Sequence, residues 1–177
     1  MNGSPTRNNK ILPTNLILDT ESEPPDRSEI TAYLETSNQV GYRSSHFTIL
    51  SALAGWYYGV KDCAVLASLV VLTSRLYWKN PIPGWRRNLD ITVVNGSLFY
   101  QTWKYYRYLS TRQRRWYTFS IGCTLAHYLT ARYYGQSLST YAISCRCHQG
   151  VHFWGNLANI LLYRSVSRSL CLGWSKR

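Results

Sequence analysis

Residues 46–78 read HFTILSALAGWYYGVKDCAVLASLVVLTSRLYW, which is two apolar runs separated by the charged pair Lys61 and Asp62. Each run approaches the roughly 20 residues that a helix needs to cross a bilayer core, if flanking Tyr, Trp and Lys are counted as interfacial residues. Three further runs follow at 89–106, 115–134 and 141–163. This pattern predicts an all-α fold, namely an integral membrane helical bundle with about four to five spans.

Short breaks separate these runs. Pro81, Pro83 and Gly84 stop a helix after the second run, and the basic segment 107–115 and the segment GQSLS at 135–139 mark the next two breaks. The alternative is a soluble bundle of unusually aromatic helices. We favour the membrane because residues 46–163 contain two carboxylates, whereas a soluble bundle needs mixed charge on its outer faces. The expected localisation is therefore integral and multi-pass.

Charge divides the chain unevenly. The 177 residues carry a net charge of +12, yet residues 1–35 have a net charge of −3 and the remainder a net charge of +15. We predict a disordered, mildly acidic tail at 1–42, a multi-span helical membrane domain at 43–165 and a basic tail at 166–177. This length excludes a large multidomain enzyme. We expect no cleaved signal peptide, because no charged segment followed by an apolar stretch and a cleavage site opens the chain.

Two histidines form the most suggestive pair for chemistry. His148 and His152 are four residues apart, so that both imidazoles lie on one face of a helix and can share a metal ion. A zincin would need Glu after the first histidine, and Gln149 stands there instead. The alternative is that both histidines make interfacial hydrogen bonds. Phosphate-loop, dinucleotide and serine-hydrolase motifs are missing from the sequence, so ATP-driven and redox-cofactor chemistry lack support.

Other polar residues fall at the same predicted membrane face as this pair. His46 opens the first span, Ser74 closes the second and Asp90 opens the third, while His127 lies in the middle of the fourth. We expect His46, His148 and His152 to bind Zn²⁺ as an open three-histidine site, with Asp90 orienting a water molecule and Ser74 supporting it.

Asp90 has simpler interpretations too. It could pair with Arg86 or Arg87 one turn earlier, or cap the N-terminus of its helix. Asn156 and Asn159, in the last run, could bond to neighbouring helices as packing residues.

The stretch SRLYWKNPIPGWRRNLD at 74–90, together with HQGVH at 148–152, resembles the superfamily of alkaline ceramidases, adiponectin- and progestin-type receptors and hemolysin III proteins. Ser74, Asp90, His148 and His152 match its motifs in order. The resemblance implies a seven-span, zinc-dependent lipid amide hydrolase. Trp78 stands where the superfamily has a metal-binding histidine, and we expect His46 to replace that ligand.

Two functions therefore stay open, a zinc-dependent membrane hydrolase acting on lipid and a non-catalytic protein that organises a membrane or binds a partner. In the second, basic side chains bind the anionic headgroups of a lipid bilayer, each contributing about 1 kcal/mol. Nucleic acid is not favoured, because the glycine–aromatic motif of an RNA-binding module is missing. The expected headgroup ligands are Arg86, Arg87, Arg112, Arg114 and Arg115.

Overall fold

A computed structural model describes residues 27–79, 81, 84–137 and 139–174. These residues are almost entirely helical, as the apolar runs predict. The elements are α1 (Arg27–Ser45), η1 (His46–Thr48), α2 (Ile49–Tyr57), α3 (Lys61–Trp78), α4 (Trp85–Tyr105), η2 (Tyr106–Tyr108), α5 (Thr111–Tyr134) and α6 (Tyr141–Trp174).

The local sequence explains where helices begin and end. Gly59 ends α2 with a φ of 73°, a conformation that side chains disfavour, and the amides of Gly59 and Val60 donate to the carbonyls of Trp56 and Gly55 in a Schellman arrangement. Ser110 caps α5 through a reciprocal capping box with Gln113. Turn and cap residues therefore divide the chain into separate helices.

The predicted membrane spans are wrong. Among the described residues, no helix combines the length and the apolarity needed to cross a bilayer. The first apolar run is divided between η1 and the nine-residue α2, and longer helices carry charged and polar side chains within their length, such as Arg87 and Asp90 in α4. Counting aromatic run ends as interfacial overestimated the apolar lengths. The integral membrane bundle and the multi-pass membrane localisation are therefore not supported.

The expected acidic tail falls partly outside the described residues, which begin at residue 27. Residues 27–42 of that tail form most of α1, and α6 continues to Trp174 through much of the expected basic C-terminal tail. The Tyr33 hydroxyl accepts a hydrogen bond of 3.0 Å from the amide of Ala142, and the Tyr141 hydroxyl donates to the Asn38 side chain at 2.7 Å. Contacts with α6 thus stabilise α1, a helix that its own sequence favours only weakly.

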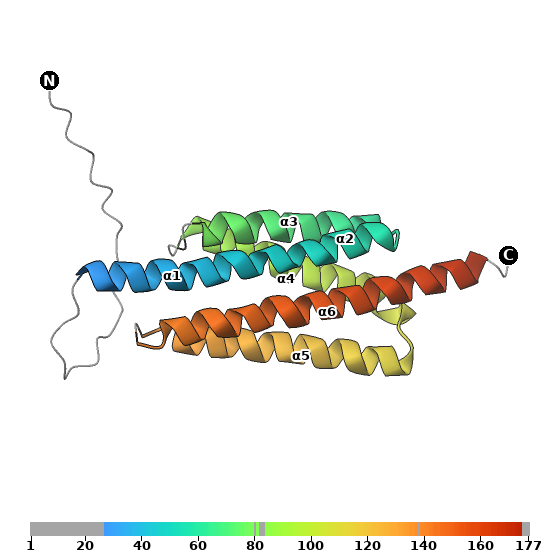
Figure 1. Ribbon diagram of the computed structural model, residues 1–177. Coiled ribbons are helices and arrows are strands. Elements are labelled where there is room, and N and C mark those ends of the chain that lie inside the picture. The colour runs from blue at the N-terminus through green and yellow to red at the C-terminus, as the bar shows by residue number, and fades with distance from the viewer. Residues whose placement is uncertain (1–26, 80, 82–83, 138, 175–177) are drawn as a thin grey trace, which may run out of the picture.

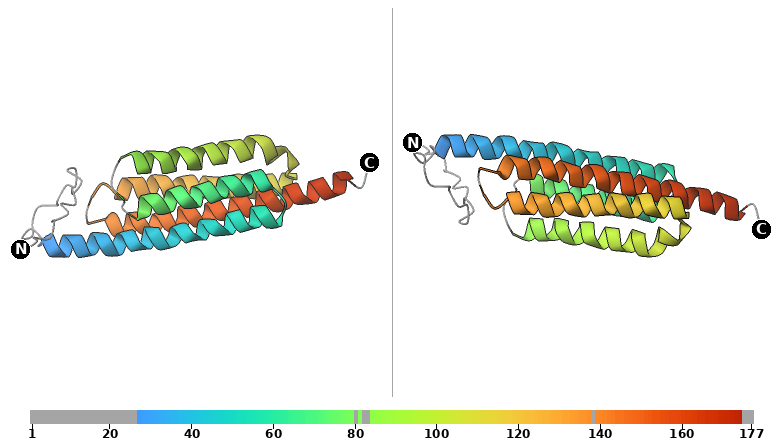
Figure 2. Two further views of the ribbon diagram at one scale, coloured as in Figure 1. Left: turned by 90° about the horizontal axis from the view of Figure 1, so that it is seen from above. Right: turned by 90° about the horizontal axis from the view of Figure 1, so that it is seen from below.

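The helices form an elongated bundle with their axes roughly along one direction (Figure 1). α1, η1 and α2 follow one another along one rod, and α3 returns beside α2 after the turn at Gly59. α4 packs on α3, and α5 packs along α6. The N-terminal end of α1 and the C-terminal end of α6 project beyond opposite ends of the bundle (Figure 2). α6 contacts α1, α2 and α5 and is the central helix of the bundle.

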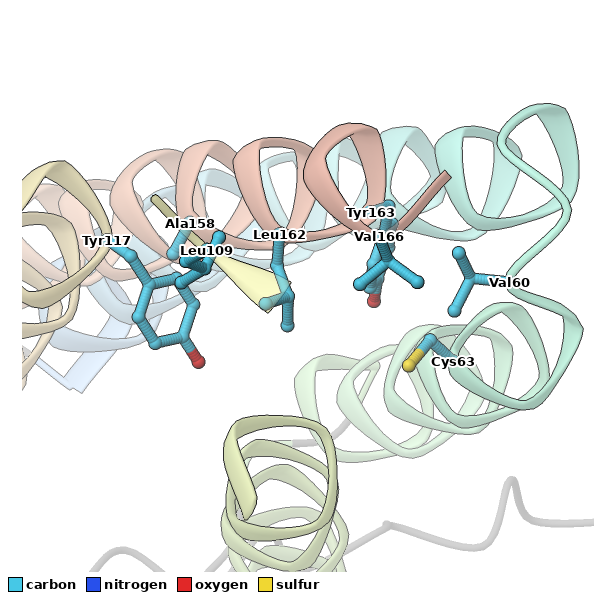
Figure 3. Packing of buried hydrophobic residues seen from close by; sticks show 8 residues of the cluster. All are labelled: Val60, Cys63, Leu109, Tyr117, Ala158, Leu162, Tyr163 and Val166. Carbon is cyan, nitrogen blue, oxygen red and sulfur yellow. The ribbon is translucent and has the colours of Figure 1, made fainter. Parts of the chain in front are cut away.

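A small apolar core lies where the second half of α6 meets the start of α3 and the first turns of α5 (Figure 3). Leu162, Tyr163 and Val166 of α6 are at most 1% exposed, and Cys63 of α3 and Tyr117 of α5 pack near them. The Tyr163 hydroxyl donates to the Gln101 side chain at 3.0 Å, so that even this core contains a polar link to α4. The candidate site lies farther along α6, toward its N-terminal end.

Candidate functional site

The inner face of α6 is polar where it meets η1 and α2. His152, Asn156 and Asn159 follow the spacing of one helix face. The Thr48 hydroxyl shares a hydrogen bond of 3.2 Å with Nδ1 of His152, and Ser51 hydrogen-bonds to both asparagines, donating to Asn156 and accepting from Asn159 at 3.1 Å. Asn156 and Asn159 therefore bond to a neighbouring helix, as a packing role predicts.

His148 and His152 form a compact ring cluster with Trp78 of α3. The ring centroids of His148 and His152 are 4.9 Å apart, and those of Trp78 and His148 are also 4.9 Å apart. Burial lowers the pKa of His148 to about 4. Burial and the neighbouring His148 lower the pKa of His152 to about 3. Both imidazoles are thus neutral at pH 7, which is the form that binds metals.

Two polar atoms of this cluster are buried without a hydrogen-bond partner among the described residues, namely Nε2 of His152 and Nε1 of Trp78. His152 is 8% exposed and Trp78 is 7% exposed, so that bulk solvent does not readily satisfy either atom. Leaving such an atom unpaired costs on the order of 1–3 kcal/mol. The cluster is therefore the least satisfied part of the polar interior.

Asp90 of α4 lies against α3. Its Oδ1 accepts hydrogen bonds from Ser74 at 2.7 Å and from Thr73 at 3.0 Å. Desolvation raises the pKa of Asp90, and the two hydroxyl donors oppose that shift. The N-cap of α4 is Gly84, and no salt bridge joins Asp90 to an arginine within the described ranges. Neither of the simpler interpretations of Asp90 matches this geometry.

The other two histidines each direct Nδ1 to the backbone carbonyl oxygen four residues earlier. The ring of His46 packs edge-on against Tyr42, and its Nδ1 is 2.9 Å from the Tyr42 carbonyl oxygen. His127 of α5 has its Nδ1 2.8 Å from the carbonyl oxygen of Cys123, and its ring lies against Gly150 of α6. His46, the first residue of η1, thus directs a ring nitrogen to a backbone carbonyl of α1.

The residues present do not complete a three-ligand zinc site. In the part of the chain that the structure describes, no group of three or more His, Cys, Asp and Glu side chains lies close enough to hold a metal ion. The structure brings His148 to His152 and Ser74 to Asp90, and Trp78 occupies the space beside His148. The unpaired imidazole nitrogen of His152, beside the ring of His148, is a feature that suits a metal. No metal-dependent step follows from this incomplete set.

Sequence reasoning did not identify three hydroxyl residues that complete the polar interior, namely Thr48, Ser51 and Thr73. All three are buried, and each bonds to a side chain on another helix. For Thr48 and Ser51 the signal is that Ser51 and Ala52 follow Thr48 by three and four residues within an apolar run, which indicates a helix face of small side chains.

Among the described residues, the site is a hydrogen-bonded interior in which Trp78 and His152 of the ring cluster each keep one unpaired ring nitrogen. Comparisons with protein-family models, with curated proteins and with solved structures gave no match for this chain.

Proposed function

We propose that this protein is a non-catalytic lipid-binding protein, in which surface aromatic and aliphatic side chains contact acyl chains and arginines contact anionic headgroups. One observation carries the proposal. Polar side chains occupy much of the interior, while large apolar side chains are exposed on the outer faces of the helices. Such an interior is unusually polar, and large exposed apolar surfaces mark sites of interaction.

The exposed apolar residues occur on successive helices. Trp56 of α2 is 53% exposed, Leu72 of α3 is 62% exposed, and Phe99 and Trp103 of α4 are 73% and 75% exposed. Phe153 of α6 is 62% exposed. Fully burying such a side chain contributes on the order of 1.5–3 kcal/mol, and contact with acyl chains would bury it. A partner with a small apolar contact would leave most of this surface in water.

Basic side chains stand at both ends of this apolar surface. Arg112, Arg114 and Arg115 are exposed in the first turns of α5, and Arg86 and Arg87 are half-buried at the start of α4. Among the described residues, Asp62 forms its salt bridge with Lys104, at 2.8 Å, and not with any of these arginines. The arginines are thus available to the phosphate groups of lipids, at about 1 kcal/mol for each base.

Vesicle flotation tests this proposal. The full chain is mixed with vesicles of phosphatidylcholine alone or with added phosphatidylserine, and the floating fraction is measured at two salt concentrations. We expect more flotation with phosphatidylserine, and less flotation of the Arg112→Gln/Arg114→Gln/Arg115→Gln variant. A variant with three other exposed arginines neutralised, Arg132→Gln/Arg146→Gln/Arg164→Gln, is the matched control for net charge. Equal losses in both variants, or no flotation of the wild type, would overturn the proposal.

Zinc-dependent hydrolysis is the second candidate function, and it is favoured by the unpaired Nε2 of His152 beside His148. It requires a third protein ligand, because catalytic zinc sites use three protein ligands and an open position. Metal analysis of the purified chain tests it. Zinc bound in a 1:1 ratio and lost in both His148→Ala and His152→Ala would support this function. A zinc-free protein, or zinc that His148→Ala leaves unchanged, would exclude it.

A further inference from the structure

A groove lies between the C-terminal end of α4 with η2 and the first turns of α5. Its volume is about 560 Å³, within the usual range of small-molecule sites. We call it the α4–α5 groove. It is lined chiefly by Trp103, Tyr106, Arg107, Arg114, Tyr117 and Ile121.

The groove exists because neighbouring helices pack in separate pairs. α4 packs on α3 and α5 packs on α6, so that α4 and α5 have few close backbone contacts with each other. Hydroxyl groups bridge them instead. The Thr102 and Tyr117 hydroxyls are 2.6 Å apart, and the Tyr106 and Thr118 hydroxyls are 3.5 Å apart. These bridges hold the walls in place without filling the space between them.

Two arginines line the groove. The Arg114 guanidinium lies 5.3 Å from the centre of the Tyr106 ring and donates to the carbonyl of Arg107 at 3.3 Å. Arg107 lies over the Tyr108 ring and donates to its hydroxyl at 3.4 Å. A guanidinium has five N–H donors, so most of them stay free. Neither arginine forms a salt bridge with a carboxylate in the described part of the chain, and the groove therefore suits an anion.

Apart from Thr102 and Thr118, the rest of the lining is apolar and aromatic. Trp103 is 75% exposed, and Ile121 and the rings of Tyr106 and Tyr117 continue the lining beside it. An anionic group alone would leave this surface in contact with water. The lining therefore matches a molecule that has a compact anion at one end and a hydrocarbon chain at the other.

We propose that the α4–α5 groove binds a single-chain lipid phosphate, with the phosphate between Arg107 and Arg114 and the chain along Trp103 and Ile121. This inference rests on the proposed lipid-binding function and names the lipid class that this one groove selects. Guanidinium groups recognise phosphate through paired N–H donors, and tryptophan contacts apolar chains while keeping its N–H free.

Calorimetric titration of the full chain with oleoyl lysophosphatidate, below its micelle concentration, tests the inference. Glycerol 3-phosphate supplies the headgroup without the chain, and mono-oleoylglycerol supplies the chain without the phosphate. We expect lysophosphatidate to bind at least about tenfold more tightly than either. The Arg107→Gln/Arg114→Gln variant should weaken binding about 25-fold, at roughly fivefold for each arginine. Trp103 fluorescence should shift to shorter wavelength on binding, and a W103F variant should lose that component.

The matched control is Arg132→Gln/Arg146→Gln, which removes the same charge from exposed positions that do not line the groove. We expect it to change lysophosphatidate affinity by less than about twofold. A second variant, Thr118→Phe, fills the groove and keeps every charge, so it should abolish lysophosphatidate binding. Equal weakening by the two arginine pairs, equally tight binding of glycerol 3-phosphate, or unchanged binding by Thr118→Phe would overturn the inference.

Flotation of the same variants separates the two proposals. If Thr118→Phe still floats with phosphatidylserine vesicles while wild-type protein fails to bind lysophosphatidate, the groove inference fails and the general lipid-binding function stands. If no variant and no wild-type protein floats, the general function fails, whatever the titration shows.

Discussion

Ser74 on α3 donates a 2.7 Å hydrogen bond to Asp90 on α4, and this bond places a carboxyl group between two helices. Thr73 donates to the same oxygen, and no cation completes an ion pair with Asp90 in the described ranges. Desolvation therefore dominates and raises the pKa of Asp90. The neutral carboxyl group is the form that this interface favours.

We expect Asp90→Asn to change how the free energy of unfolding depends on pH. A raised pKa means that the stabilising contribution is complete below the ordinary pKa of 3.8 and is lost as the pH rises through the folded-state value. Asparagine keeps an acceptor for both hydroxyls and carries no charge. The histidines change stability in both proteins, so the difference between them is what reports Asp90. In urea unfolding from pH 4 to pH 8, the free energy of unfolding of Asp90→Asn minus that of the wild type should increase with pH.

Asp62 supplies the control for that experiment. Its hydrogen bonds from Lys104, Tyr100 and Tyr105 outweigh desolvation and lower its pKa to about 2, so that it stays ionised from pH 4 to pH 8. Asp62→Asn should lower stability by a similar amount across this range. Parallel curves for the wild type and Asp90→Asn would show that Asp90 has an ordinary pKa.

The buried histidines predict the opposite pH dependence. Because burial lowers the pKa of His148 to about 4 and that of His152 to about 3, the stability present above pH 6.5 is lost as the pH falls toward those values. For each histidine, the free energy of unfolding falls by at most about 1.4 kcal/mol for each unit that the pH decreases. His148→Gln/His152→Gln should remove this acid-induced loss between pH 6.5 and pH 4, as measured by urea midpoints. The same loss in the variant would exclude these histidines as its source.

Two helical glycines should respond differently to alanine. A Cβ at Gly150 would lie 2.0 Å from Cδ2 of His127, whose ring is held by its 2.8 Å contact with the Cys123 carbonyl. Gly150→Ala should therefore destabilise the α5–α6 contact by about 1–3 kcal/mol. Gly96 of α4 has open space around it, so Gly96→Ala should stabilise the fold by about 0.5–1 kcal/mol. Thermal unfolding of both variants checks the pair, and equal effects would contradict this packing.

The sequence allowed the helices to be placed but not their environment. Pro81 and Gly84 separate α3 from α4, and Lys61 begins α3, as the breaks in the apolar runs predict. The bilayer assignment was wrong because an apolar run of suitable length does not make a helix of that length, as the end of α2 at Tyr57 shows. The helix α1 was missed because its polar composition gives little local preference, and because it packs on α3 and α6, whose contacts lie from 33 to more than 100 positions away.

The site was predictable where it depended on spacing within one helix. His148 and His152 lie together because residues four apart share a helix face. His46 could not be placed in this way, since its orientation depends on how α1 continues into η1 and α2. Thr48, two residues later, points to His152, whereas the His46 ring packs on Tyr42.

The position of α6 at the end of the helix order determines when the interior can form during synthesis. Thr48 and Ser51 are bonded to residues 104 and 105 positions later in the chain. At about 5–20 residues per second, the ribosome needs roughly 5–20 s to add those partners. During that interval the hydroxyls of Thr48 and Ser51 lack their partners on α6. The helices that are synthesised earlier therefore cannot complete these interhelical hydrogen bonds. The bundle forms only after α6 has been synthesised.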